Sequence, residues 1–299
     1  MSKFLMMCGL PASGKSTIAQ ELAIKYSANI HSSDALRREL FGDENDNSKN
    51  NELFQELHKR IKQDLSDGKN VIYDATNIHY KRRKAFLGEI SKCGCEKICY
   101  LVATPYEICQ LQNKGREREV PEHVIKRMYT TFYIPQKYEG WDDIQIHWNM
   151  GEPNWSISEL LKYSDGFNQD NPHHDLTLGG HLRKCLINIS SSDYVLGMAA
   201  ILHDIGKPFT KTFRNKKGEL SDIAHYYDHH LVGAYNAMFY LKSSGFDDEA
   251  ILEICNYIQW HMQPYFIETE KARAKFVRLV GQEFYDKLML LHQADQAAH

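Results

Sequence analysis

A glycine-rich loop near the start of the chain constrains its fold more than any other sequence feature. The loop spans Gly9–Ser16, reads Gly-Leu-Pro-Ala-Ser-Gly-Lys-Ser and fits the pattern Gly-x₄-Gly-Lys-Ser/Thr. The apolar run Lys3–Cys8 before it predicts a strand, and the residues from about Ser16 to Lys25 predict a helix. A strand, this loop and a helix in succession are typical of a loop that wraps its backbone N–H groups around a phosphate. A plain glycine-rich turn is the structural alternative.

Side chains of the loop suit a nucleoside triphosphate with Mg²⁺. Lys15 can reach the β- and γ-phosphates, and the Ser16 hydroxyl can bind the metal. Asp74, at the end of a later predicted strand, is placed to hold the same Mg²⁺ through water. The residues that we predict to bind ATP are Gly9, Ser13, Gly14, Lys15, Ser16 and Thr17.

The rest of the first half alternates between predicted strands and predicted helices. Further strands are predicted at residues 28–32, 71–74 and 98–103, with helices after Asp34, at 53–65 and at 82–91. Such alternation predicts a parallel sheet with helices on both faces, an α/β domain of the P-loop NTPase type. The polar stretch at residues 45–51 is interpreted as a loop.

Asp34 and Arg37 are candidates for handling the phosphate acceptor. They follow the second predicted strand, and ligands lie beyond the carboxyl ends of strands in an open parallel sheet. A carboxylate there can accept the proton of an attacking hydroxyl. Arg37, one helical turn later, can clamp an anionic group. The alternative for Asp34 is that it caps the N-terminus of the helix.

Two arginines in a later polar segment are candidates for a lid. Arg116 and Arg118 lie in the segment Arg116–Pro121, and such a segment can bring arginines over a phosphate during its transfer. An ordinary charged loop is the alternative. The basic run Lys81–Lys84 is interpreted as a solvated helix face rather than a phosphate site.

These motifs together resemble the 5′-polynucleotide kinase branch of the P-loop phosphotransferases, over about residues 3–145. The matching pieces are Gly9–Thr17, Asp34-x-x-Arg37, Asp74-x-Thr76-Asn77 followed by Arg82-Arg83, and Arg116–Met128. The resemblance implies that Asp34 is the general base for a 5′-hydroxyl and that Arg37 holds the neighbouring phosphate. It also implies that Arg116 or Arg118 stabilises the transition state. Related kinases that act on small molecules share the P-loop and the lid.

The character of the chain changes near residue 150. Residues 149–155 and 165–172 are rich in Gly, Pro, Asn and Asp, as linkers are, and divide the chain into domains 1–150 and 151–299. Helical patterns dominate beyond the linker, and no strand is predicted there. The second half has 14 basic and 19 acidic side chains, net −5, against 22 and 20, net +2, in the first. It also holds 10 of the 15 histidines, a composition that suits a metal site.

Several His and Asp residues on separate predicted helices are candidate metal ligands. His203 and Asp204 are adjacent and cannot share a regular helix face, but at a helix C-terminus before Gly206 both can turn toward one ion. Imidazole and carboxylate ligands suit transition-metal ions, Mn²⁺ or Mg²⁺, and such an ion lowers the pKa of a bound water. Lys207 can neutralise a substrate phosphate. The predicted ligands are His181, His203, Asp204, His229, His261 and Asp295.

This second set resembles the HD phosphohydrolase superfamily, from about residue 170 to the end. The matching pieces are Ile201–Pro208, Leu176-Thr177 ahead of His181, His229–Ala234 and Ala294-Asp295. The resemblance implies an all-α HD-type helical domain that binds Mn²⁺, Fe²⁺, Ni²⁺ or Co²⁺. In it His181, His203, Asp204 and Asp295 hold a first ion, and His229 and His261 add a second, with His230 as the competitor of His229. His173 and His174 are left open between phosphate contacts and a polar loop.

The two candidate sites together predict a bifunctional enzyme that heals broken nucleic-acid ends, RNA more than DNA. ATP would phosphorylate a 5′-hydroxyl, and the metal site would remove a 2′,3′-cyclic, 2′- or 3′-phosphate, with a functional link to a ligase. The alternatives are a nucleoside, nucleotide or sugar kinase fused to a nucleotide phosphatase, and a sensor without turnover. No run approaches the roughly 20 apolar residues that span a bilayer. Seven cysteines without a framework favour free thiols, so we expect a cytoplasmic protein.

Overall fold

The computed structural model describes residues 1–43, 48–116, 118–151, 155–172 and 175–298. The chain forms two compact units, which are described separately. Unit 1 comprises residues 1–128 and 135–151, and unit 2 comprises residues 129–134 and 152–299.

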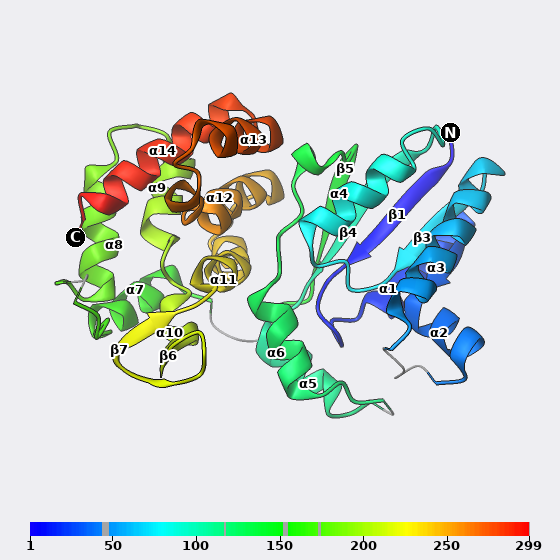
Figure 1. The fold of residues 1–299 in the computed structure, drawn as a ribbon, viewed down its shortest axis with the longest axis horizontal. Helices are drawn as coiled ribbons and strands as arrows, with labels where there is room; N and C mark the ends of the chain where they lie inside the picture. The colour runs from blue at the N-terminus through cyan, green and yellow to red at the C-terminus, as the bar shows by residue number, and fades with distance from the viewer. Residues whose placement is uncertain (44–47, 117, 152–154, 173–174, 299) are drawn as a thin grey trace. The chain divides into compact units, whose positions relative to one another are not determined.

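Unit 1 is built on a five-stranded sheet with the strand order β2-β3-β1-β4-β5 and parallel pairing throughout (Figure 1). The central strand β1 pairs with both β3 and β4, so that Leu5 is opposite Ile72 on one side and Ile98 on the other. The strands are β1 (Lys3–Cys8), β2 (Ala28–Ser32), β3 (Asn70–Asp74), β4 (Glu96–Ala103) and β5 (Asp143–Trp148). The predicted parallel α/β domain is therefore confirmed.

Helices cover both faces of this sheet. On one face, Ala19 and Leu22 of α1 pack on Leu5, Met7 and Ile72 of the strands. On the other face, Phe86 of α4 contacts Phe4 and Tyr73, with ring centroids 5.6 and 5.5 Å apart. The helices are α1 (Lys15–Tyr26), α2 (Ser33–Phe41), α3 (Asn50–Ser66), α4 (Tyr80–Glu89), α5 (Tyr106–Asn113) and α6 (Glu122–Thr130), with a 3₁₀ turn η1 (Lys137–Glu139).

Two features of unit 1 differ from the sequence expectation. The edge strand β5 was not predicted, because apolar and polar residues alternate in its short sequence and no apolar run marks it. The interpretation of residues 45–51 as a loop is wrong at its end, since α3 begins at Asn50. Residues 44–47 lie outside the described part of the chain.

Unit 2 is mainly helical, with one small two-stranded sheet. Its helices are α7 (Ile157–Asp165), α8 (Leu178–Asn188), α9 (Tyr194–Leu202), α10 (Lys207–Thr210), α11 (His229–Ser243), α12 (Asp248–Trp260), α13 (Glu270–Val280) and α14 (Gln282–Gln296), with a 3₁₀ turn η2 (Gln263–Phe266). The apolar faces of α9, α11 and α12 supply much of its core, including Leu196, Phe239 and Ile254.

The expectation that the second half contains no strand is wrong. Strands β6 (Lys211–Arg214) and β7 (Leu220–Tyr226) form an antiparallel hairpin in which Lys211 is opposite Tyr226. The chain reverses through a turn whose Gly218 has a φ of 83°, a value that glycine adopts without strain. The strand β6 and the turn are polar and basic, and the apolar residues of β7 are scattered, so no apolar run marks either strand. Among the described helices, none is both long and apolar enough to cross a bilayer.

Candidate active sites

The glycine-rich loop follows β1 and is shaped by close backbone packing. A Cβ atom on Gly9 would lie 2.9 Å from both the Ser13 Oγ and the Val102 carbonyl oxygen, so only glycine fits there. Gly14 precedes α1 with a φ of 93°, and Ala12 has a φ of 59°. The Thr104 hydroxyl donates to the Ser13 carbonyl at 3.0 Å and braces the loop from just beyond the end of β4, a contact that no motif indicated.

Lys15 and the two predicted Mg²⁺ ligands lie together beside this loop. The Lys15 ammonium donates to the Leu10 carbonyl at 2.5 Å and lies 3.5 Å from the Ser13 Oγ. Burial lowers the pKa of Lys15, an effect that nearby Asp74 opposes. The Ser16 hydroxyl donates to an Asp74 carboxylate oxygen at 2.9 Å, and burial raises the pKa of that carboxyl. Thr17 follows on the first turn of α1, with its side chain exposed.

Asp34 lies between two arginines at the start of α2. Its two carboxylate oxygens are 3.0 Å from Arg37 Nη1 and 2.9 Å from Arg118 Nη1. Arg37 is buried and also donates to the Asn50 side-chain oxygen at 2.9 Å, a support that sequence reasoning missed. The capping role belongs to Ser32, whose side chain accepts from the Ala35 N–H, and not to Asp34.

The lid segment and the basic run differ in how their arginines are placed. Arg118 reaches Asp34, whereas Arg116 is exposed and its backbone N–H donates to the Asn113 carbonyl at 3.2 Å.

The interpretation of the basic run Lys81–Lys84 as a solvated helix face is wrong for Arg83. That side chain is buried and makes a two-pronged ion pair with Glu139, with both N–O distances 2.7 Å.

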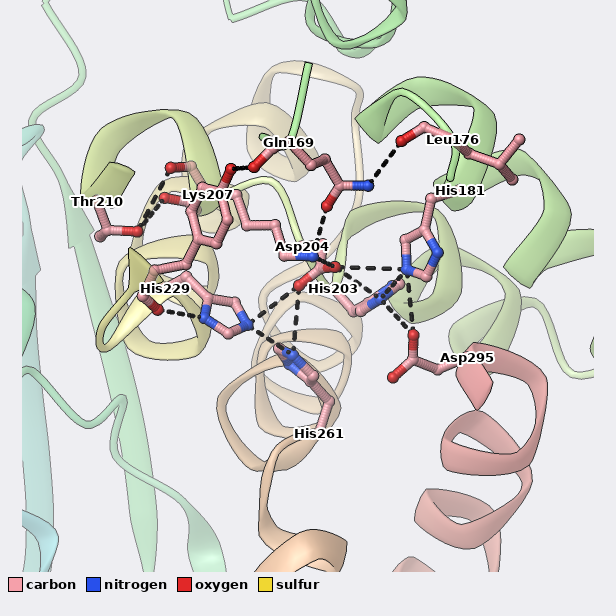
Figure 2. A network of polar contacts seen from close by, with 12 residues as sticks. Gln169, Leu176, His181, His203, Asp204, Lys207, Thr210, His229, His261 and Asp295 are labelled. Carbon is pink, nitrogen blue, oxygen red and sulfur yellow. Dashed lines mark hydrogen bonds and ion pairs between the residues drawn. The ribbon is translucent and has the colours of Figure 1, made fainter. Parts of the chain in front are cut away.

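In unit 2, the six predicted metal ligands converge on one point (Figure 2). Asp204 is at the centre. One of its oxygens lies 3.4 Å from Nε2 of both His181 and His203, and the other lies 3.1 and 3.5 Å from Nε2 of His229 and His261. Asp295 on α14 closes the first group, 3.1 Å from His181.

The histidine rings are oriented by hydrogen bonds behind the cluster. The Nδ1 atoms of His203, His229 and His261 each lie 2.7 to 2.8 Å from a backbone carbonyl oxygen three residues earlier in the chain. Each Nδ1 is therefore a protonated donor, so the ring presents Nε2 toward Asp204, where it can bind a metal ion once it has lost its proton. Across the cluster, Nε2 atoms pair at 3.2 Å for His181 and His203 and at 3.1 Å for His229 and His261.

Backbone packing brings the His203–Asp204 turn against the start of α11, which carries His229. His203 follows the last residue of α9, and the turn that begins there places Asp204 beside it. A Cβ atom on Gly206 would lie 2.0 Å from the His229 carbonyl oxygen and 2.6 Å from the Gly233 nitrogen. Glycine therefore allows this turn to press against the start of α11, which holds Asp204 next to His229.

The charges of the cluster are strongly coupled. Burial would raise the pKa of Asp204, but Lys207 and His203 hold it well below its usual value. Conversely, burial would lower the pKa of His203, yet Asp204 and Asp295 raise it well above normal. The carboxylates thus stabilise positive charge among the imidazoles, which is the charge pattern that a divalent cation satisfies.

The donor set fits divalent metal ions in two groups that share Asp204. The groups are His181, His203 and Asp204, and Asp204, His229 and His261, with all ligand atoms in each within 4.8 Å of one another. His230, the competitor of His229, belongs to neither group, and its ring centroid is 5.8 Å from that of His229. Within the described residues neither group includes a cysteine.

The cluster opens into a cavity of about 420 Å³. Lys207 lines this cavity, where its ammonium lies 2.7 Å from Asp204 and 2.7 Å from the side-chain oxygen of Gln169. Gln169 is fully buried and also donates to the Leu176 carbonyl, so it fixes Lys207, a role that no sequence signal indicated. The cavity is lined further by Asn171, Ala224, His225, Tyr226, Tyr227, Met262 and Tyr265. His173 and His174 lie outside the described residues.

Comparison with known protein families gives the class of each half. Residues 4–135 match the model of the AAA domain, and residues 178–298 match that of the HD domain. The chain therefore joins a P-loop kinase-like domain to an HD phosphohydrolase domain, as the motifs predicted. A kinase domain of this kind uses ATP with Mg²⁺, and an HD domain uses a divalent metal ion.

Individual relatives and solved structures each match about half of the chain. Over 177 residues the chain is 27% identical to an L-seryl-tRNA(Sec) kinase from Methanococcus maripaludis, a match that covers 55% of this chain and 67% of that protein. Among solved structures it is similar to a sugar kinase from a Janibacter species, with 14% identity, a TM-score of 0.39 and coverage of 52% and 88% of the two chains. A gluconokinase from Sinorhizobium meliloti gives 14% identity, a TM-score of 0.37 and coverage of 50% and 84%.

Proposed function

We propose that this chain heals broken nucleic-acid ends, RNA in preference to DNA, by two reactions. Unit 1 phosphorylates a 5′-hydroxyl with ATP, and unit 2 removes a 2′,3′-cyclic, 2′- or 3′-phosphate. The observation that carries the proposal is the position of Asp34 between Arg37 and Arg118, near Lys15. A base flanked by two cations suits a hydroxyl whose neighbour in the same molecule is a phosphate.

In the kinase reaction, Asp34 accepts the proton of the attacking hydroxyl. The hydroxyl oxygen forms a bond to the γ-phosphorus, and the bond to the bridging oxygen breaks, so that ADP leaves with the electron pair. Lys15 stabilises the charge on the β- and γ-phosphates, and Ser16 and Asp74 hold the Mg²⁺ that accompanies ATP. Arg37 binds the phosphate next to the acceptor hydroxyl. Arg118, or Arg116 in the same segment, stabilises the charge on the γ-phosphoryl group during its transfer.

In the hydrolase reaction, the buried cluster holds the substrate phosphate beside a water. Divalent cations bound there supply Lewis acidity and lower the pKa of that water. Asp204 connects the two ligand groups through its two oxygens, and Lys207 offers positive charge to the phosphate at the cavity wall. Attack of water on a cyclic phosphate breaks one ring P–O bond, and the released sugar oxygen takes a proton, which leaves a 2′- or 3′-phosphomonoester. Attack of a second water on that phosphorus breaks the remaining P–O bond to the sugar, whose oxygen takes a proton, and inorganic phosphate leaves.

The relative that is named as an L-seryl-tRNA(Sec) kinase supports a hydroxyl acceptor carried by an RNA for the kinase half. A kinase of free nucleosides or sugars fused to a nucleotide phosphatase is the competing function. The length of the preferred acceptor separates the two, because only a polynucleotide kinase gains from phosphates beyond the first nucleotide.

The test uses the purified full chain with two substrates. A 5′-hydroxyl oligonucleotide with ATP and Mg²⁺ reports the kinase, and an RNA with a 2′,3′-cyclic phosphate end and Mn²⁺ reports the hydrolase. We expect product in both assays and a higher kcat/KM for RNA than for DNA. A higher kcat/KM for free nucleosides than for oligonucleotides, or no product at either end, would refute the proposal.

A further inference from the structure

The β6–β7 hairpin carries Lys and Arg side chains and a phenylalanine that neither candidate site uses. The hairpin, residues 211–226, contains four Lys or Arg residues against two acidic ones, Glu219 and Asp222, whereas the second half of the chain carries 19 acidic side chains against 14 basic ones. These cations are Lys211, Arg214, Lys216 and Lys217. The segment is therefore a local positive surface on an otherwise acidic unit.

Two aromatic rings lie near these cations. Phe213 is 43% exposed, and the Lys211 ammonium lies 5.8 Å from its ring centroid. Lys211 is already paired with Asp170, at 2.5 Å, so its charge is partly neutralised. Lys216 lies 5.7 Å from the ring of Tyr227 and within electrostatic reach of Asp228. Lys217 is exposed at the turn, which leaves charge available for an anionic partner.

The hairpin continues directly into the wall of the metal-site cavity. His225 and Tyr226 of β7, with the following Tyr227, line this cavity together with Asp204 and His229. The rings of His225 and Tyr227 are parallel within 7° and 5.4 Å apart. A phosphate held at the cluster thus has aromatic rings beside it, and Lys216 lies over the ring of one of them.

Cations interleaved with aromatic rings are what single-stranded nucleic acid requires, since bases stack on the rings and phosphates pair with the cations. We propose that the β6–β7 hairpin binds the nucleotides adjacent to the terminal phosphate and so directs a single strand into the HD cavity. This inference rests on the proposed function and assigns its strand-binding element. A free mononucleotide has no adjacent nucleotide, so it lacks the base and phosphate that Phe213 and Lys217 would bind.

The test compares two substrates in the full chain: an RNA oligonucleotide with a 2′,3′-cyclic phosphate end and a nucleoside 2′,3′-cyclic monophosphate. For the Lys216→Ala/Lys217→Ala double variant and for Phe213→Ala, we expect the oligonucleotide KM to rise about tenfold, because a stacked base or a pair of phosphate contacts is lost. Turnover of the monophosphate should change less than about twofold.

Binding of a labelled oligonucleotide, followed by fluorescence anisotropy without metal, should weaken in the same variants. For the double variant, the slope of the logarithm of the binding constant against the logarithm of the salt concentration should become less steep by about 1.4, since each phosphate contact contributes about 0.7 on a single strand.

The matched control is Lys271→Ala/Lys275→Ala, which removes the same charge from exposed positions on α13 of the same unit. Equal effects of the two double variants, or oligonucleotide binding that the hairpin variants leave unchanged, would overturn the inference. Loss of binding to anionic lipid vesicles rather than to the oligonucleotide would also overturn it and identify a membrane contact instead. Absence of any hydrolysis by the unchanged chain would instead refute the proposed function, because the anisotropy measurement does not depend on turnover.

Discussion

At the scale of single residues, the surroundings of Asp34 hold its carboxylate in one position. Its carboxylate is half exposed, yet both oxygens are held by arginines, one of them the buried Arg37. Since Ser32 caps the helix, the N-terminal cap of α2 does not depend on the Asp34 carboxylate. An ion pair of such exposure contributes little to folding. Under the proposed function, its value lies in placing a base for the acceptor hydroxyl.

The substitution Asp34→Asn tests this role. The amide keeps the shape but cannot take a proton, so we expect kinase kcat to fall by about 10²- to 10⁴-fold. The melting temperature should be nearly unchanged. Ser32→Ala is the control: loss of its cap should cost about 1 kcal/mol of folding free energy. Full kinase kcat in the Asp34→Asn variant would exclude this side chain as the base.

Arg83 is a residue whose charge serves the fold. Its guanidinium makes the buried ion pair with Glu139 and also donates to the Asn77 carbonyl at 2.8 Å. Arg83→Met should destabilise unit 1 by about 3–5 kcal/mol, because Glu139 is left buried without its charge partner. Arg82→Met, at the exposed neighbouring position, should change the free energy of unfolding by less than about 0.5 kcal/mol. Urea denaturation followed by circular dichroism compares the two variants.

At the scale of elements, side-chain hydrogen bonds and ion pairs connect helices to the strands of the sheet. Asp64 on α3 is the clearest case. Its carboxylate accepts hydrogen bonds from Asn29 and His31 of β2, each at 2.9 Å, and from Lys69 at 2.7 Å. Burial acts to raise the pKa of Asp64, but these donors outweigh it and lower the pKa to about 2.

This shift predicts a pH dependence of stability. The folded-state pKa of about 2 lies below the ordinary value of 3.8, so the ionised form favours folding. The stabilisation is complete above about pH 4 and is lost as the pH falls toward 2. Asp64→Asn should therefore lower the free energy of unfolding by about 1–2 kcal/mol at pH 7 and by much less near pH 2. Denaturation at both pH values checks this.

Asp67→Asn is the control for that measurement, because the same Lys69 approaches its carboxylate at 3.4 Å on the surface. Exposed pairs of this kind contribute close to nothing. A pH-independent difference between Asp64→Asn and the unchanged chain would contradict the assignment of the effect to this carboxylate.

At the scale of the whole molecule, each candidate site is assembled inside one unit. The phosphate loop, Asp34, Arg118 and Asp74 belong to unit 1, and all six metal-ligand candidates belong to unit 2. Each unit also has its own buried core. We therefore expect each activity to be lost without the other when its own site is altered.

Two variants test that independence. Lys15→Ala should abolish kinase activity and leave hydrolysis within about twofold, and Asp204→Ala should do the reverse, since distant substitutions without shared partners are additive. Metal content of the purified variants separates loss of the ion from loss of the fold: Asp204→Ala should lose metal and Lys15→Ala should keep it. Loss of both activities from either substitution would indicate one shared site or general misfolding.

Local signals were sufficient where geometry follows from neighbours in the chain. The glycines of the phosphate loop, the strand before it and the helix after it are contiguous, so the motif at 9–16 specified its own conformation. The pair His203-Asp204 before Gly206 likewise indicated a helix end, as found. These predictions held because backbone sterics and hydrogen bonding act over a few residues.

Only the tertiary structure decided which distant groups meet. Arg118, and not Arg116, contacts Asp34, which lies 84 positions earlier in the chain. Arg83 is buried against Glu139, 56 positions away, and Gln169 holds Lys207, 38 positions away. The β6–β7 hairpin was missed because its apolar residues are few and scattered and form no run that marks a strand, so the pairing of its two strands was not visible in the sequence. The sequence by itself determined the two phosphate-handling motifs and their order, whereas packing determined how their side chains are paired, because close-packed contacts join residues that no local pattern links.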